Sequence, residues 1–155
     1  MALEKLRQDI EQNKISLSDA IVKALSELKE KENDKTMAWL ANELQGYSNP
    51  LNFYYQPKHD FPEYRVVNGF LKLMTKEGTL VNLEHSLANR SDYFLSVPIS
   101  WLEEAATLPG ETRFTEMPEF SHDISSGQGV VVQYSGSQLQ TVLQEVKNRL
   151  LVLLK

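Results

Sequence analysis

The residues that most often carry chemistry are sparse in this chain of 155 residues and show no catalytic or metal-binding spacing. The three histidines, His59, His85 and His122, lie in separate segments. None stands three or four residues from another, the spacing that places two imidazoles on one helix face for a metal. Cysteine is absent, which excludes thiolate nucleophiles, cysteine-bound zinc and disulfides. We therefore expect no metal, no cofactor and no catalytic residues.

Two short patterns resemble fragments of known motifs. Residues 145–147, Glu-Val-Lys, match the Glu-x-Lys half of a restriction-type nuclease motif, which needs a strand and a preceding metal-binding acid. Here the pattern lies in a helical repeat, where residues two apart do not face each other. Residues 126–129, Ser-Gly-Gln-Gly, lack the strand–loop–helix context and the Lys-Ser/Thr ending of a phosphate loop. The first pattern predicts a solvated helix face and the second a turn.

An acid–base site assembled only by the fold remains an alternative. It would need His59, Asp60, Glu63 and Arg65 to converge on one pocket. The adjacent acids Glu103-Glu104 look instead like a solvated face.

The overall charge argues against a nucleic-acid-binding surface. Sixteen Lys and Arg residues oppose 21 Asp and Glu residues, for a net charge of −5. The N-terminus lacks the apolar core of a signal peptide, and the longest apolar run, 150–154, is too short to cross a bilayer. With no cysteine, these features favour a cytoplasmic protein that does not enter a membrane.

Apolar spacing predicts helices at both ends of the chain. The first 46 residues read as three helices, the second starting at a capping box over 16–19 and the third ending near Gln45. A final helix starts at Ser135 or Ser137. Its apolar stripe repeats at 4-3-4-3, a spacing that suits internal core or a second chain. The stripe consists of Leu139, Leu143, Val146, Leu150 and Leu153.

The middle of the chain predicts strands. Strand signals occupy 64–74, with Gly69 as a bulge, then 80–83, 93–97 and 130–134. A short helix is expected over 99–106, and 107–129 is rich in loop residues. The proline- and aromatic-rich segment 47–62 is too long for a structureless loop, so part of it should be ordered. The fold class is therefore α+β: three N-terminal helices, a small antiparallel sheet of about four strands, and a long C-terminal helix.

The length fits one domain over 1–155. The chain stops directly after a helical pattern, which favours an N-terminal domain of a longer protein.

One block is more specific than its composition. Residues 39–47 and 62–69 follow the pattern W-L-x-x-E-L-x-G-Y … P-x-Y-R-x-x-x-G. This pattern resembles the AbiTii domain, named for a bacterial abortive-infection (phage-resistance) protein. The helix start at 16–20 and the segment 145–151 of the last helix are similar to that family too. The resemblance spans nearly the whole chain and implies phage defence, but it carries no assigned chemistry.

Within this block, Trp39 should pack the third helix onto the core, and Gly46 should permit a left-handed turn at its end. Glu43 and Arg65 can pair across the helix-to-sheet junction. In the structural interpretation, the block together with Gly69 only fixes that junction. In the functional interpretation, Glu43, Tyr47, Tyr64 and Arg65 line a pocket or a contact surface.

The leading functional hypothesis is a non-enzymatic interaction, oligomerisation or regulatory domain of a bacterial antiphage protein. Its expected partner is a protein, either a second copy or another domain of the same system. One alternative is a toxin-type enzyme such as a nuclease. Another is a sensor that binds a ligand or phage component through 47–62, which exposed rings at Tyr54, Tyr55 and Phe61 would favour.

Overall fold

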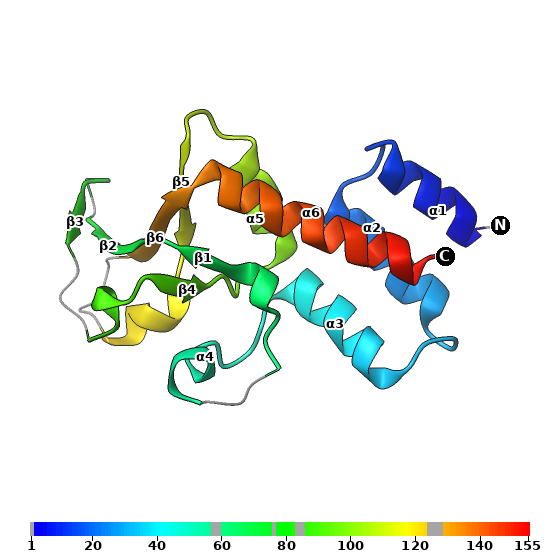
Figure 1. Ribbon diagram of the computed structural model, residues 1–155, viewed down its shortest axis with the longest axis horizontal. Helices are drawn as coiled ribbons and strands as arrows, with labels where there is room; N and C mark the ends of the chain where they lie inside the picture. Colours follow the sequence, from blue (N-terminus) through cyan, green and yellow to red (C-terminus); the bar gives the residue numbers. More distant parts are fainter. Residues whose placement is uncertain (1, 57–59, 76, 83–85, 124–128) are drawn as a thin grey trace.

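The computed structural model describes residues 2–56, 60–75, 77–82, 86–123 and 129–155. It confirms the predicted α+β class: helices at the N-terminal end, antiparallel sheets, and a long last helix, α6 (Gly136–Leu153). The three N-terminal helices gather at one end of the molecule and the strands at the other, and α6 runs from the strands to these helices (Figure 1). Both termini lie at the helical end.

Three helices form the N-terminal part, as predicted: α1 (Ala2–Glu11), α2 (Leu17–Leu28) and α3 (Asp34–Gln45). The Ser16 hydroxyl accepts a hydrogen bond from the Asp19 amide, which begins α2 as the sequence predicts.

The start of α2 has a second cap that the sequence did not suggest. Glu103, from α5 (Ile99–Ala106), accepts hydrogen bonds from the amides of Leu17 and Ser18 at 2.7 and 3.1 Å. The interpretation of Glu103 as part of a solvated face is therefore wrong. Its negative charge lies at the N-terminus of α2, where it stabilises the helix dipole.

The strands form two antiparallel sheets. The smaller pairs β1 (Val66–Asn68) with β4 (Asp92–Phe94). The larger has the order β3-β2-β6-β5, with bounds Leu80–Asn82, Phe70–Met74, Gly129–Ser135 and Thr112–Glu116.

The strand expected over 64–74 is thus two strands in different sheets, and Gly69 between them is not a bulge. A Cβ at Gly69 would lie 2.1 Å from the carbonyl oxygen of Gln133, so only glycine lets the two backbones approach this closely.

The segment 107–129, predicted to be loop-rich, also contains the edge strand β5 and the 3₁₀ turn η3 (Pro118–Asp123). Other short turns are α4 (Asn52–Tyr55), η1 (Glu63–Arg65) and η2 (Ser86–Asn89). The glycine-containing pattern at 126–129 lies outside the described residues except for Gly129, which begins β6.

The apolar stripe of α6 is buried inside the domain. Leu139, Val146 and Leu150 are completely buried, and Leu143 and Leu153 are partly buried against the same core. α6 packs on α1, α2 and α5, and it also contacts β5 and β6. The stripe is therefore core and not a seam open to another chain.

Candidate functional site

A buried ion pair between α3 and η1 lies at the centre of the sequence block 39–47 and 62–69. Arg65 donates from Nη2 to Glu43 Oε1 at 2.8 Å and from Nε to Glu43 Oε2 at 3.0 Å. Both side chains are completely buried. The remaining nitrogen, Nη1, donates to the carbonyl oxygens of Leu95 and Val97, each at 2.7 Å. Every nitrogen of the guanidinium therefore has an acceptor.

Two tyrosines complete the carboxylate's coordination. The hydroxyls of Tyr47 and Tyr64 donate to Glu43 Oε2 at 2.6 and 2.5 Å. The Trp39 indole in turn donates to the Tyr64 oxygen at 2.7 Å. Burial, and then the charge of Glu43, raises the pKa of both tyrosines above their ordinary value, so both keep their protons. Burial lowers the pKa of Arg65, but the Glu43 charge outweighs it and the pKa lies above its ordinary value.

The structure thus brings together the four residues singled out from sequence, Glu43, Tyr47, Tyr64 and Arg65. We call them, with Trp39, the buried network. Glu43 and Arg65 have no surface for a ligand, and their polar atoms are satisfied within the protein. Together these bonds hold α3 against the start of the small sheet.

Gly46 allows the chain to make this junction. It ends α3 with a φ of 96°, where side chains are rarely tolerated, and a Cβ there would lie 2.9 Å from the Ser96 carbonyl oxygen. The next residue, Tyr47, donates its amide to the same oxygen at 2.8 Å. The turn thereby points the Tyr47 ring back into the buried network.

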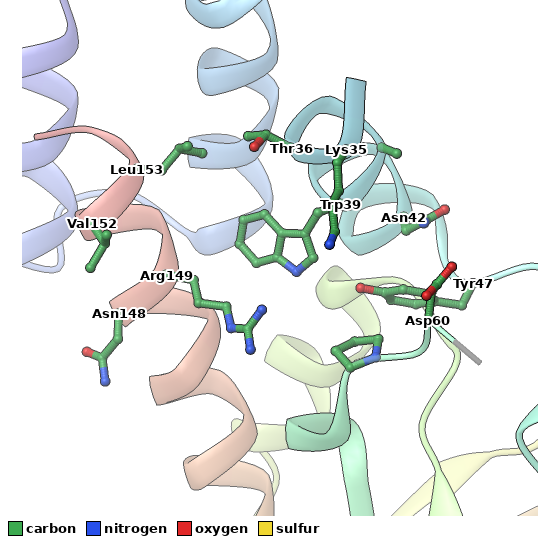
Figure 2. Close-up of a pocket in the computed structure, with 12 residues that line it drawn as sticks. Lys35, Thr36, Trp39, Asn42, Tyr47, Asp60, Asn148, Arg149, Val152 and Leu153 are labelled. Carbon is green, nitrogen blue, oxygen red and sulfur yellow. The ribbon is translucent and has the colours of Figure 1, made fainter. Parts of the chain in front are cut away.

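An open groove borders the buried network and lies between α3 and α6 (Figure 2). Its volume is about 890 Å³, and Trp39 and Tyr47 belong both to the network and to the groove. The remaining lining residues are Lys35, Thr36, Ala38, Asn42, Asp60, Pro62, Asn148, Arg149, Val152 and Leu153. In Figure 2, Arg149 extends from α6 toward the side of the groove that carries Trp39. We call this hollow the α3–α6 groove.

The acid–base cluster considered from the sequence does not assemble among the described residues. Asp60 lines the α3–α6 groove, whereas Glu63 lines a different hollow beside Tyr55 and Arg90. Arg65 is enclosed. His59 and His85 lie outside the described residues, as does the environment of the His122 side chain. The part of the chain that the structure describes contains no group of three or more His, Asp or Glu residues that could hold a metal.

The Glu-x-Lys pattern at 145–147 lies on α6 and not on a strand. Lys147 donates to the side chain of Asn13 at 2.9 Å. It therefore ties the last helix to the loop after α1.

Most rings of the segment 47–62 are used in packing. Tyr54 contacts Tyr93 and Phe120, and its oxygen accepts the Phe94 amide at 3.0 Å. Phe61 packs on Phe94, with ring centroids 4.9 Å apart. Tyr55 alone of the three named rings is well exposed, at 63%. Packing is thus the main role of these rings.

Glu119, a buried acid of η3, is not predicted as a functional residue by any sequence pattern. It is 7% exposed; its Oε2 lies 3.5 Å from the Ser96 hydroxyl, and its Oε1 has no partner among the described atoms. Burial raises its pKa to about 7. Its one local signal is that it stands between two apolar residues, Met117 and Phe120, which are both completely buried.

Fold and site together define a class: an α+β domain in which a fully bonded ionic network supports an open, largely apolar groove. The AbiTii family model matches residues 2–154, and the chain belongs to the AbiTii family. The family name connects the chain to abortive infection, a bacterial antiviral defence. The chain matches no curated protein and no solved structure. No helix of the described residues has the length and apolar character needed to cross a bilayer.

Proposed function

We propose that this chain is a non-catalytic regulatory domain of a bacterial phage-defence protein, and that it acts by binding a ligand in the α3–α6 groove. The groove itself is the observation that carries the proposal. Its volume of about 890 Å³ lies within the range of about 300–1,000 Å³ typical of binding pockets. Its wall combines apolar and aromatic side chains with polar and charged ones, the combination that gives a pocket both affinity and specificity.

The buried network supports this role because it makes the groove wall rigid. Trp39 is held by Tyr64, and Tyr47 by Glu43, through hydrogen bonds of 2.7 and 2.6 Å. A wall fixed before binding loses little conformational entropy when a ligand arrives. Glu43 and Arg65 are completely buried and bonded to each other, so neither can reach a ligand in the groove, which favours binding over catalysis at this site.

The partner that this domain regulates is, in our proposal, a protein: a second copy or another domain of the same defence system. The stripe of α6 is unsuitable for that contact, because Leu139, Val146 and Leu150 are buried in the domain's own core. Light scattering at tens of micromolar tests self-association, and a strict monomer would leave another domain as the partner.

The groove is tested by a matched pair of surface substitutions. Val152→Gln removes apolar surface from the groove, and Val22→Gln makes the same change on α2, outside it; the two valines are 65% and 51% exposed. Both variants should unfold within about 0.5 kcal/mol of wild type. Phage plating on cells that produce the defence protein should rise with Val152→Gln and not with Val22→Gln.

If cells with either variant are protected from phage equally well, the groove is not the binding site on which defence depends. A wild-type protein that does not lower plating would contradict the defence role itself.

A further inference from the structure

Arg149 is placed in the α3–α6 groove as a charge without a counter-charge. Its guanidinium carbon lies 4.8 Å from the centroid of the Tyr64 ring. Among the described residues it has no ion-pair partner and no hydrogen-bonded carboxylate. A guanidinium on an aromatic face keeps its edge free for a planar or tetrahedral anion.

Arg149 is also held in place from below. The Tyr64 ring beneath it is fixed by its bonds to Glu43 and Trp39, at 2.5 and 2.7 Å. The Glu43 charge is already balanced by Arg65, so it does not neutralise Arg149. The buried network therefore presents a cation in a defined position.

The charge balance of the groove is opposite to that of the whole molecule. Lys35, one helical turn before Trp39, is the second cation, and it too lacks an ion-pair partner in the described part of the chain. Asp60 is the groove's one carboxylate within the described residues. Two cations against one anion occur here in a chain whose net charge is −5. The groove thus attracts negative charge that the rest of the surface repels.

The remainder of the groove suits an apolar body. Trp39, Pro62 and Val152 add ring and aliphatic surface to its lining, and Figure 2 shows the Trp39 ring beside Arg149. The hollow is large enough for a molecule of one or two rings and too small for a folded chain.

We propose that the α3–α6 groove binds a small amphipathic anion, with its carboxylate, phosphate or sulfate group on Arg149 and its apolar body against Trp39. This inference rests on the proposed function and adds the chemistry of the ligand. The anion forms two parallel N–H···O bonds with the guanidinium, while Lys35 adds a charge without fixed geometry. Arg149 is the residue that selects an anion over a neutral molecule of the same shape.

Two dyes that differ only in an anionic sulfonate group test this selection. Anilinonaphthalene sulfonate carries a sulfonate, and phenylnaphthylamine has the same rings without it. The test is done in a Trp101→Phe background, because Trp101 is the second of the two tryptophans and lies outside the groove. Energy transfer from Trp39 then reports that the dye is bound to the protein, and the arginine substitutions locate it in the groove. We expect the sulfonate to bind at least about tenfold more tightly, and this difference to shrink with salt.

Substitutions at arginine give the decisive comparison. Arg149→Gln should remove the preference for the sulfonate and leave the affinity for phenylnaphthylamine unchanged. Arg7→Gln, on α1 and outside the groove, is the matched control and should change neither. Arg149→Lys keeps the charge without the planar fork and should restore part of the preference.

The outcomes separate this inference from the proposed function. Equal affinity of the two dyes, or equal loss of both with Arg149→Gln, would overturn the anion selection while the groove remained a binding site. If neither dye receives energy from Trp39 at millimolar concentration, the groove binds no such body, and both proposals are wrong.

Discussion

At the scale of single residues, the Glu43–Arg65 pair decides how α3 meets the sheets. Removing two charges from water costs several kcal/mol, which is recovered only if the remaining polar atoms are bonded. Here that condition is met: two tyrosine hydroxyls complete the carboxylate, and two carbonyl oxygens complete the guanidinium. The pair therefore specifies one geometry, because any other arrangement leaves a buried charge without a partner.

A double-mutant cycle tests this argument. Glu43→Gln leaves Arg65 buried without its counter-charge and should lower the free energy of unfolding by about 3–5 kcal/mol. Arg65→Met should cost a similar amount because it strands the carboxylate. The double variant should lose less than the sum of the two, with a coupling energy of about 1–3 kcal/mol in urea unfolding. Strict additivity would mean that the two charges do not depend on each other.

Glu119 should make stability depend on pH in an unusual direction. Its folded-state pKa, raised by burial to about 7, lies above the ordinary value of 4.5, so the folded protein holds the proton more tightly than the unfolded chain. The stabilisation is complete below pH 4.5 and is lost as the pH rises through about 7. The loss should reach about 3 kcal/mol, from about 1.4 kcal/mol per pKa unit.

Glu119→Gln supplies the control for this prediction. Since glutamine does not titrate, the difference in unfolding free energy between wild type and variant should change between pH 5 and pH 8. The wild type should lose stability relative to the variant as the pH rises. A difference independent of pH would mean that Glu119 is ionised in the folded protein throughout.

At the scale of elements, α2 depends on a residue of α5 for its first turn. Glu103 accepts two of the amides that a helix start leaves without partners. Glu103→Gln removes the charge and should cost about 1–2 kcal/mol of unfolding free energy. Glu104→Gln, next to it but exposed, should cost less than about 0.5 kcal/mol. Thermal unfolding of the two variants measures the difference; equal values would show that the contact adds nothing to stability.

The same contact shows what local sequence can and cannot predict. Ser16 and Gly46 are signals read by the neighbouring residues alone, and the structure confirms both helix ends. Glu103 acts across 86 residues, so no local pattern identifies it. The strand pattern singles out Gly69, but the reason for a glycine there is the close approach of Gln133, which depends on strand pairing and not on the neighbouring residues.

Strand β5 is not predicted from the sequence for a similar reason. Thr112–Glu116 contains two charged residues in five and only one buried side chain, Thr115, so its apolar signal is weak. Its pairing with β6 makes it a strand. For the candidate site, the block over 39–69 indicated the buried network, whereas the groove that borders it also requires α6, whose approach to α3 no repeat in the sequence predicts.

At the scale of the whole molecule, α6 joins the strand-rich and helix-rich ends (Figure 1). Its first turns contact β5 and β6, and its length also carries it past α1, α2 and α5. Leu139 and Leu150 are both completely buried along this path. Because the buried face of α6 packs against both ends, the two ends share a single core. The two ends should therefore unfold together.

Leu150→Ala tests this coupling. The substitution leaves a cavity in the core and should lower the free energy of unfolding by about 2–5 kcal/mol. Val152→Ala, two residues on and 65% exposed, should change it by less than about 0.5 kcal/mol.

Urea unfolding is followed by far-ultraviolet circular dichroism, which reports mainly the helices, and by hydrogen exchange of β6. Both signals should shift by the same free energy in Leu150→Ala, since loss at one end of a shared core destabilises the other. If exchange in β6 keeps its wild-type protection while the helices melt early, the two ends are separate folding units and α6 only bridges them.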